Sequence, residues 1–274
     1  MKTPRVSLRK LRSSGGFSLI EVAVVLIIIT VLFALLAAPL SGQIEARRIE
    51  ETRRLLETSK EALLGFAVAN GRLPCPASTT SNGVESFCTT GGVGACGAAT
   101  TTVQAHGRCS NPFDGFVPAV TLGVSPVDAN GYLIDAWTNA NASRIRYAVS
   151  TENDGTNYSL TRVDGIKART MATVAASSEN LVVCSTGLTA AASATVCNAP
   201  TQTLASGAAA VLFSLGSNGG TAFASLSFDE QNNQSAVPDK VFSSGTPTTN
   251  FDDVVTWLSL NTLFGRMVQA GKLP

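Results

Sequence analysis

The chain has 274 residues and a formal net charge of +1, and only 14% of its residues are charged, against the usual quarter. The charges of residues 1–16 are all basic, and the rest of the chain carries 15 basic and 19 acidic residues. The body therefore has no positive excess with which to bind nucleic acid. The roughly 200 residues beyond the N-terminal apolar and helical stretches suit one domain.

A short basic leader precedes a long apolar run. Residues 17–40 contain one charge, Glu21, and as a helix they are long enough to cross a bilayer. Because positive charge stays on the cytoplasmic side, we expect the C-terminal body to be exported. An ordinary signal peptide and an uncleaved anchor are the alternatives, although the run is longer than a usual signal core and no Ala-x-Ala site closes it. The basic residues are Lys2, Arg5, Arg9, Lys10 and Arg12.

The junction of leader and apolar run, Gly16-Phe17-Ser18-Leu19-Ile20-Glu21, resembles the processing motif of type IV prepilins and type II secretion pseudopilins. This resemblance implies that a prepilin peptidase cuts after Gly16 and that the new N-terminus, Phe17, is N-methylated. It also implies that Glu21 is an assembly contact. The partner of Glu21 is the amine of a neighbouring subunit or, alternatively, the subunit's own amine.

The resemblance implies a structural subunit, pilin-like or pseudopilin-like and of the minor kind, rather than an enzyme. The expected partners are the prepilin peptidase/N-methyltransferase, other pilin or pseudopilin subunits and an inner-membrane assembly platform. The expected location is the inner membrane, single-pass, with a periplasmic C-terminal domain that enters a periplasmic or cell-surface filament. The alternative is a membrane-anchored periplasmic enzyme or binding protein, but the single histidine, His106, disfavours a Ser-His-Asp or Cys-His site.

We expect the helix to continue as residues 41–70, with a kink at Pro39, because proline lacks a backbone donor. Apolar residues recur at Ile49, Leu56 and Leu63, so this part should pack on the core of its own domain. Asn70-Gly71 is a stop signal. The expected divisions are a cleaved leader 1–16, a transmembrane or filament-core helix 17–40, a periplasmic helix 41–70, and an exported domain 71–274 with a Cys-rich insertion 71–116.

The six cysteines indicate disulfides in an oxidising compartment. A zinc site is disfavoured because Cys-x-x-Cys is absent from the sequence. For the insertion we prefer a nested scheme, with Cys88–Cys96 across a Gly-rich turn inside Cys75–Cys109. The sequential scheme, Cys75–Cys88 with Cys96–Cys109, remains open. Cys184–Cys197 closes its own loop.

Short strand patterns come after the insertion, at 134–139, 144–149, 157–163, 181–184, 209–214 and 251–258. The segregation of helical and strand signals predicts an α+β fold. We expect a pilin-like long N-terminal helix, half in the membrane and half periplasmic, on an antiparallel sheet, with the disulfide-tied insertion and a short C-terminal helix. Asp135-Ala-Trp137 followed by Arg146-Tyr147 is similar to a segment of pseudopilin globular domains, with Thr138 in place of their usual Gly.

The C-terminal helix is predicted by one apolar face, and it should pack on the sheet. That face consists of Leu260, Leu263, Phe264, Met267 and Val268. A loop with Asp229, Glu230 and Asp239 offers oxygen ligands, and the family resemblance makes a structural calcium conceivable there. The spacing matches no EF-hand, and a solvated turn is the simpler interpretation.

Overall fold

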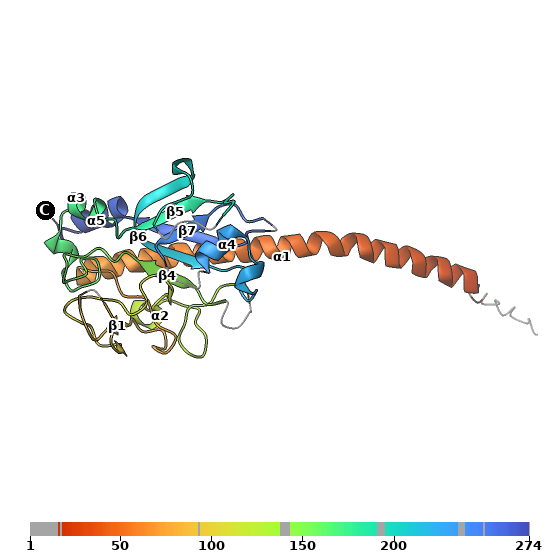
Figure 1. Ribbon diagram of the computed structural model, residues 1–274. Coiled ribbons are helices and arrows are strands. Elements are labelled where there is room, and N and C mark those ends of the chain that lie inside the picture. Colours follow the sequence, from red (N-terminus) through yellow and green to blue (C-terminus); the bar gives the residue numbers. More distant parts are fainter. Residues whose placement is uncertain are drawn as a thin grey trace, which may run out of the picture. The chain divides into compact units, whose positions relative to one another are not determined.

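The computed structural model describes residues 16, 18–92, 94–137, 143–190, 195–234, 239–248 and 250–273, but not the side chains of 34–41. The chain divides into two compact units, Met1–Ala46 and Arg47–Pro274. Helix α1 (Leu19–Asn70) contributes to both units, and the remaining elements belong to the second (Figure 1).

In the second unit, α1 buries one face in the main hydrophobic core, as predicted. Leu56, Leu63 and Leu64 are almost fully buried there, with Ile49 packed at the edge. The helix ends at Asn70, whose side-chain amide donates to the carbonyl of Phe66. Gly71 follows at φ +67°, and a Cβ atom there would meet the Asp164 carboxylate at 2.5 Å. The stop signal therefore acts through a left-handed turn that suits only glycine.

The core sheet has six strands in the order β3-β4-β6-β5-β7, with β8 also paired to β6. All pairs are antiparallel except β5 with β7. The strands are β3 (Gly115–Phe116), β4 (Arg146–Val149), β5 (Leu181–Ser185), β6 (Thr203–Ser214), β7 (Val241–Ser244) and β8 (Val254–Ser259).

Short helices complete the unit: α2 (Ala119–Leu122), η2 (Ile166–Ala168), α3 (Met171–Ala175), η3 (Pro200–Gln202), η4 (Phe223–Ser225), α4 (Phe228–Asn233) and α5 (Leu260–Gln269). The predicted C-terminal helix is confirmed as α5, which buries Leu260, Leu263, Phe264 and Met267. Val268, which we placed on the same face, is 49% exposed.

The α+β class agrees with the structure, but the pilin-like architecture that we expected is contradicted. The sheet is mixed, not antiparallel, because β7 runs parallel to β5. Parallel strands cannot be joined by a tight hairpin, and the connection from β5 to β7 is long, since it contains η3, β6, η4 and α4. Residues 157–163, expected as a strand, form turns.

The membrane half of the expected helix is also contradicted. Within the described residues, the structure has no helix with both the length and the apolar character needed to cross a membrane. This finding corrects the transmembrane assignment of 17–40 and the single-pass inner-membrane location. The kink expected at Pro39 concerns a side chain outside those described.

The cysteines pair as in the nested scheme: Cys75–Cys109, Cys88–Cys96 and Cys184–Cys197, with no free cysteine among the described residues. The insertion also contains a two-stranded sheet of β1 (Phe87–Cys88) and β2 (Ala99–Thr100). The outer bond joins the two ends of the insertion and the inner bond closes its tip.

We expect mild reduction to open Cys88–Cys96 before the other two disulfides. Thiol–disulfide exchange requires access to a sulfur, and Cys96 is half-buried whereas the cysteines of the other two pairs are buried. Limited dithiothreitol, alkylation and peptide mapping should label Cys88 and Cys96 first. Simultaneous labelling of all six cysteines would contradict this order.

Candidate functional site

The processing motif lies at the beginning of α1. Gly16 is exposed, and Phe17 lies outside the described residues. The carbonyl of Ser18 accepts hydrogen bonds from the backbone N–H groups of Glu21 and Val22, so the helix starts immediately after Ser18. Glu21 lies in the first turn, and its side chain is exposed. The motif thus combines an accessible Gly16 with a carboxylate one turn into the helix.

The first unit also presents an exposed apolar surface on α1. Leu19, at its start, is 89% exposed, and large apolar side chains continue to Phe33. A contiguous apolar surface of this kind marks an interaction site. Its members are Leu19, Ile20, Val22, Val24, Val25, Leu26, Ile27, Ile28, Ile29, Val31, Leu32 and Phe33.

The Asp135-to-Tyr147 segment is part of the interior of the second unit. Asp135 accepts hydrogen bonds from the Ser214 hydroxyl and from the backbone N–H of Trp137. Trp137 and Tyr147 belong to the main core, and the Tyr147 hydroxyl donates to the carbonyl of Pro74 at 3.1 Å. Burial raises the pKa of Asp135 to about 7, although both hydrogen bonds oppose this change. These contacts give the segment a structural role, and Thr138 lies outside the described residues.

We predict that Asp135 makes the domain less stable as the pH rises. Because its folded-state pKa exceeds the usual value near 4, the folded protein keeps a proton between about pH 4 and pH 7 that the unfolded chain has released. The free energy of unfolding should fall through this window, by about 2–4 kcal/mol from this group, and level off above it. Asp135→Asn mimics the protonated acid and should remove this part of the pH dependence.

The measurement is urea unfolding of the wild type and Asp135→Asn at several pH values, with the disulfides intact. The difference between the free energies of unfolding of the two proteins reports on Asp135 alone. The contribution of Asp239, whose pKa is raised to about 6 by burial, is the same in both and cancels. A difference that stays constant from pH 4 to pH 8 would show that Asp135 titrates normally.

Three acids approach each other beside α4. Carboxylate oxygens of Glu230, Asp252 and Asp253 lie within 4.8 Å of one another. Burial raises the pKa of Asp253 well above its usual range, although the Asn233 side chain donates to it. Protonation of Asp253 relieves the repulsion among the three groups. Asp252 and Asp253 were not recognised from the sequence, where their only signal is an acidic pair directly before the strand β8.

The calcium ligands suggested by the sequence do not converge in the structure. The Asp229 carboxylate accepts from the backbone N–H groups of Gly187 and Leu188, and Asp239 accepts from that of Val241. Of the three suggested residues, only Glu230 joins the acidic cluster. Among the described residues, Asp229, Glu230 and Asp239 are therefore not gathered into one carboxylate cluster.

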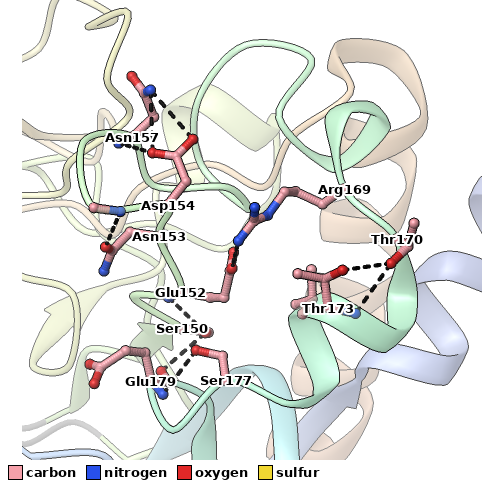
Figure 2. A network of polar contacts seen from close by, with 12 residues as sticks. Ser150, Glu152, Asn153, Asp154, Asn157, Arg169, Thr170, Thr173, Ser177 and Glu179 are labelled. Atoms are coloured by element: carbon pink, nitrogen blue, oxygen red, sulfur yellow. Dashed lines mark hydrogen bonds and ion pairs between the residues drawn. The ribbon is translucent and has the colours of Figure 1, made fainter.

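A polar network organises the segment between β4 and β5 (Figure 2). Arg169 donates to Glu152 at 2.5 Å, and Glu152 is buried. The side chain of Thr170 caps α3 by accepting from the backbone N–H of Thr173. Asp154 accepts from the backbone N–H of Asn157 and closes a turn. These contacts hold the chain that leads from β4 into α3.

His106 makes structural hydrogen bonds within and next to the insertion. Its Nδ1 accepts from the backbone N–H of Arg108, and its carbonyl accepts from that of Tyr158. Burial, followed by the positive charge of Arg108, lowers the pKa of His106. Within the part of the chain that the structure describes, the hydrogen bonds at His106 pair it with no serine or cysteine nucleophile.

Fold and site together define a disulfide-bonded α+β domain that follows a helix with an exposed apolar surface. Comparisons with protein-family models, with curated proteins and with solved structures found no match.

Proposed function

We propose that this chain is a structural subunit, a pilin or pseudopilin, of a type IV pilus or type II secretion-like filament. A prepilin peptidase cuts the precursor after Gly16, and subunits assemble through the beginning of α1. Subunits of its own kind, the peptidase and an assembly platform are its partners, and its work is not catalytic. The proposal rests above all on the Gly16-to-Glu21 motif at the start of an exposed apolar helix.

The helix supports the proposal because its apolar side chains lack a cover within the first unit. The surface from Leu19 to Phe33 is exposed, and burying an apolar side chain yields about 1.5–3 kcal/mol. If each copy packed this surface of α1 against the same surface of its neighbours, the apolar side chains of every subunit would be removed from water. Association through α1 therefore has a strong driving force that a catalytic role would not need.

We expect Gly16→Leu to leave the precursor uncut. A Cβ atom at Gly16 has nothing within 4 Å, so the substitution should disturb recognition by the peptidase and not the fold. Intact-mass measurement of the protein from its native host should show retention of residues 1–16, whereas the wild type should begin at a methylated Phe17.

Gly42→Leu is the matched control. Gly42 is an exposed glycine of α1, also with open space around it, and its variant should be cut normally. Normal cutting of Gly16→Leu, or a wild-type protein that keeps Met1, would refute the processing step on which the proposal depends.

A further inference from the structure

The insertion has a small pocket of about 300 Å³ between the chain at 78–86 and the chain at 99–101. Six of its seven described lining residues carry a hydroxyl group, and none of the seven is ionisable. Three of the hydroxyl residues are buried serines, and the threonines lie closer to the surface. The six are Ser78, Thr80, Ser81, Ser86, Thr100 and Thr101.

This lining favours one chemical class of ligand. A hydroxyl group donates one hydrogen bond and can accept others. An apolar ligand would leave the hydroxyl groups without partners, which is costly once water is displaced, and an ion would meet no counter-charge in the described lining. The pocket therefore suits a neutral ligand whose own groups both donate and accept, as the hydroxyl groups of a sugar do. Its volume is at the lower end of the range for ligand pockets, roughly 300–1,000 Å³, which suits a single sugar ring.

Ser86 is the lining residue that points most directly to a ligand. It is 1% exposed, and its Oγ accepts a hydrogen bond from the Ser110 hydroxyl at 2.8 Å. Among the described residues, no group accepts the proton of the Ser86 hydroxyl itself. Because a buried donor without an acceptor is costly, an oxygen atom of a ligand in this pocket would satisfy it.

Ser81 and Thr100 add an acceptor and a second donor. The Ser81 hydroxyl donates to two backbone carbonyls, so its oxygen is left to accept from a ligand. The Thr100 Oγ1 accepts from the backbone N–H of Thr102 at 3.2 Å, which leaves the Thr100 proton to be donated. With Ser86, the two sides of the pocket thus offer both kinds of hydrogen-bonding group that a sugar hydroxyl needs.

Both sides of the pocket are held in place by contacts within the chain. The Tyr132 hydroxyl donates to the carbonyl of Ser78 at 2.8 Å and accepts from the backbone N–H of Asn82 at 3.1 Å. On the other side, β2 pairs with β1, and the Cys88–Cys96 disulfide closes the loop between these strands. A ligand would find the hydroxyl groups already in position, which lowers the cost of binding.

From these observations we propose that the pocket binds one ring of a neutral sugar, either free or at the end of a glycan chain. Ser86 and Thr100 donate to oxygen atoms of the ring, and Ser81 accepts from one of its hydroxyl groups. The pocket shares no residue with the processing motif or with the apolar surface of α1. The inference therefore goes beyond the proposed filament function and does not depend on it.

The test is saturation-transfer difference NMR of the full-length chain, in a zwitterionic detergent without a sugar head group. The probes are glucose, galactose, mannose and N-acetylglucosamine. We expect saturation transfer to at least one of them, and less to glucuronate and to protonated glucosamine, because a charge would find no partner in the pocket. Absence of transfer to all four neutral sugars, or stronger transfer to a charged one, would overturn the inference.

Two leucine variants locate the binding. Ala99 is exposed and lines the pocket, so Ala99→Leu should fill the pocket without disturbing the fold. Ala98 is its exposed neighbour outside the described lining, and Ala98→Leu is the matched control. The affinity for the best sugar should fall at least about tenfold in Ala99→Leu and stay unchanged in Ala98→Leu. Equal affinity of the wild type and Ala99→Leu would place the sugar elsewhere and refute the proposed site.

Ser86→Ala tests the donor. Loss of the hydroxyl should weaken sugar binding about tenfold, and circular dichroism with a thiol count checks the fold of this buried position. Unchanged affinity in the folded variant would contradict the contact that we assign to Ser86.

The methyl glycoside of the best sugar separates the two sources of the ligand. Binding as tight as that of the free sugar supports the end of a glycan chain, because the methyl group stands in for the linkage. Loss of binding supports a free sugar.

Discussion

Glu85→Gln is expected to lower the free energy of unfolding by about 3–5 kcal/mol, the usual cost of removing one partner of a buried ion pair. Glu85 and Arg72 are 5% and 4% exposed. Their side chains form two parallel hydrogen bonds of 2.7 Å each. Glutamine keeps the size of the side chain but leaves the Arg72 cation without a counter-charge.

The surroundings of the pair explain why the Arg72 cation would not find a second counter-charge. Arg72 lies over the rings of Phe66 and Phe87, at 5.0 and 5.6 Å from their centres. These ring faces attract a cation, but they replace neither water nor a carboxylate. Glu85 also accepts from the backbone N–H of Cys75 at 3.2 Å. The pair thus joins the end of α1 to the disulfide-linked insertion. Its loss should destabilise the packing of both.

Urea unfolding at pH 7 with intact disulfides measures the effect. Arg72→Met combined with Glu85→Gln removes both charges, and it should recover most of the lost free energy. Glu50→Ala breaks the exposed pair with Arg54 and should cost about 0.5 kcal/mol or less. If Glu85→Gln cost no more than Glu50→Ala, the buried charge would not be the source of stability that we assign to it.

The sequence predicted those features whose causes are local. Asn70-Gly71 ends α1 because glycine alone suits the left-handed turn. The Gly-rich stretch between Cys88 and Cys96 is a short connection that turns back on itself, so these two cysteines can form a disulfide. The face of α5 follows from helical periodicity. Val268 was placed wrongly because it lies at the edge of that face, where periodicity alone does not decide burial.

Features that depend on distant contacts could not be predicted. Arg72 and Glu85 are 13 residues apart, on no common helix, so no spacing rule joins them. The parallel pairing of β5 with β7 depends on where the crossover with α4 returns the chain, which the four residues of β7 do not encode. The acidic cluster likewise forms only when α4 meets the residues before β8.

Loss of filament incorporation is the expected result for both Glu21→Ala and Glu21→Gln, with normal cutting after Gly16. In the proposed filament, removal of the leader gives Phe17 a new ammonium group, four residues before Glu21 in the sequence. Among the packed apolar side chains of an assembled filament, an unpaired ammonium is costly, and attraction to a carboxylate is strong in such low dielectric. The charge of Glu21, more than its size, should therefore decide assembly.

Ser18 and Glu21 also have the spacing of a capping box, which gives Glu21 a second explanation. In that motif glutamine substitutes for glutamate, so Glu21→Gln would assemble normally if Glu21 only stabilised the first turn. If Glu21 paired solely with its own amine, Glu21→Ala would weaken that turn but leave the contacts between copies, and the variant would still enter wild-type filaments.

The measurement compares sheared filaments from cells that express the wild type, Glu21→Ala and Glu21→Gln at matched levels, each alone and together with the wild type. Intact mass confirms cutting in every sample. We expect both variants to be absent from the sheared fraction alone and depleted about tenfold or more with the wild type present, because each neighbour's ammonium then lacks its partner. Normal incorporation of Glu21→Gln would mean that Glu21 acts as a helix-capping residue. Incorporation of Glu21→Ala at the wild-type level would mean that Glu21 is not part of the assembly contact.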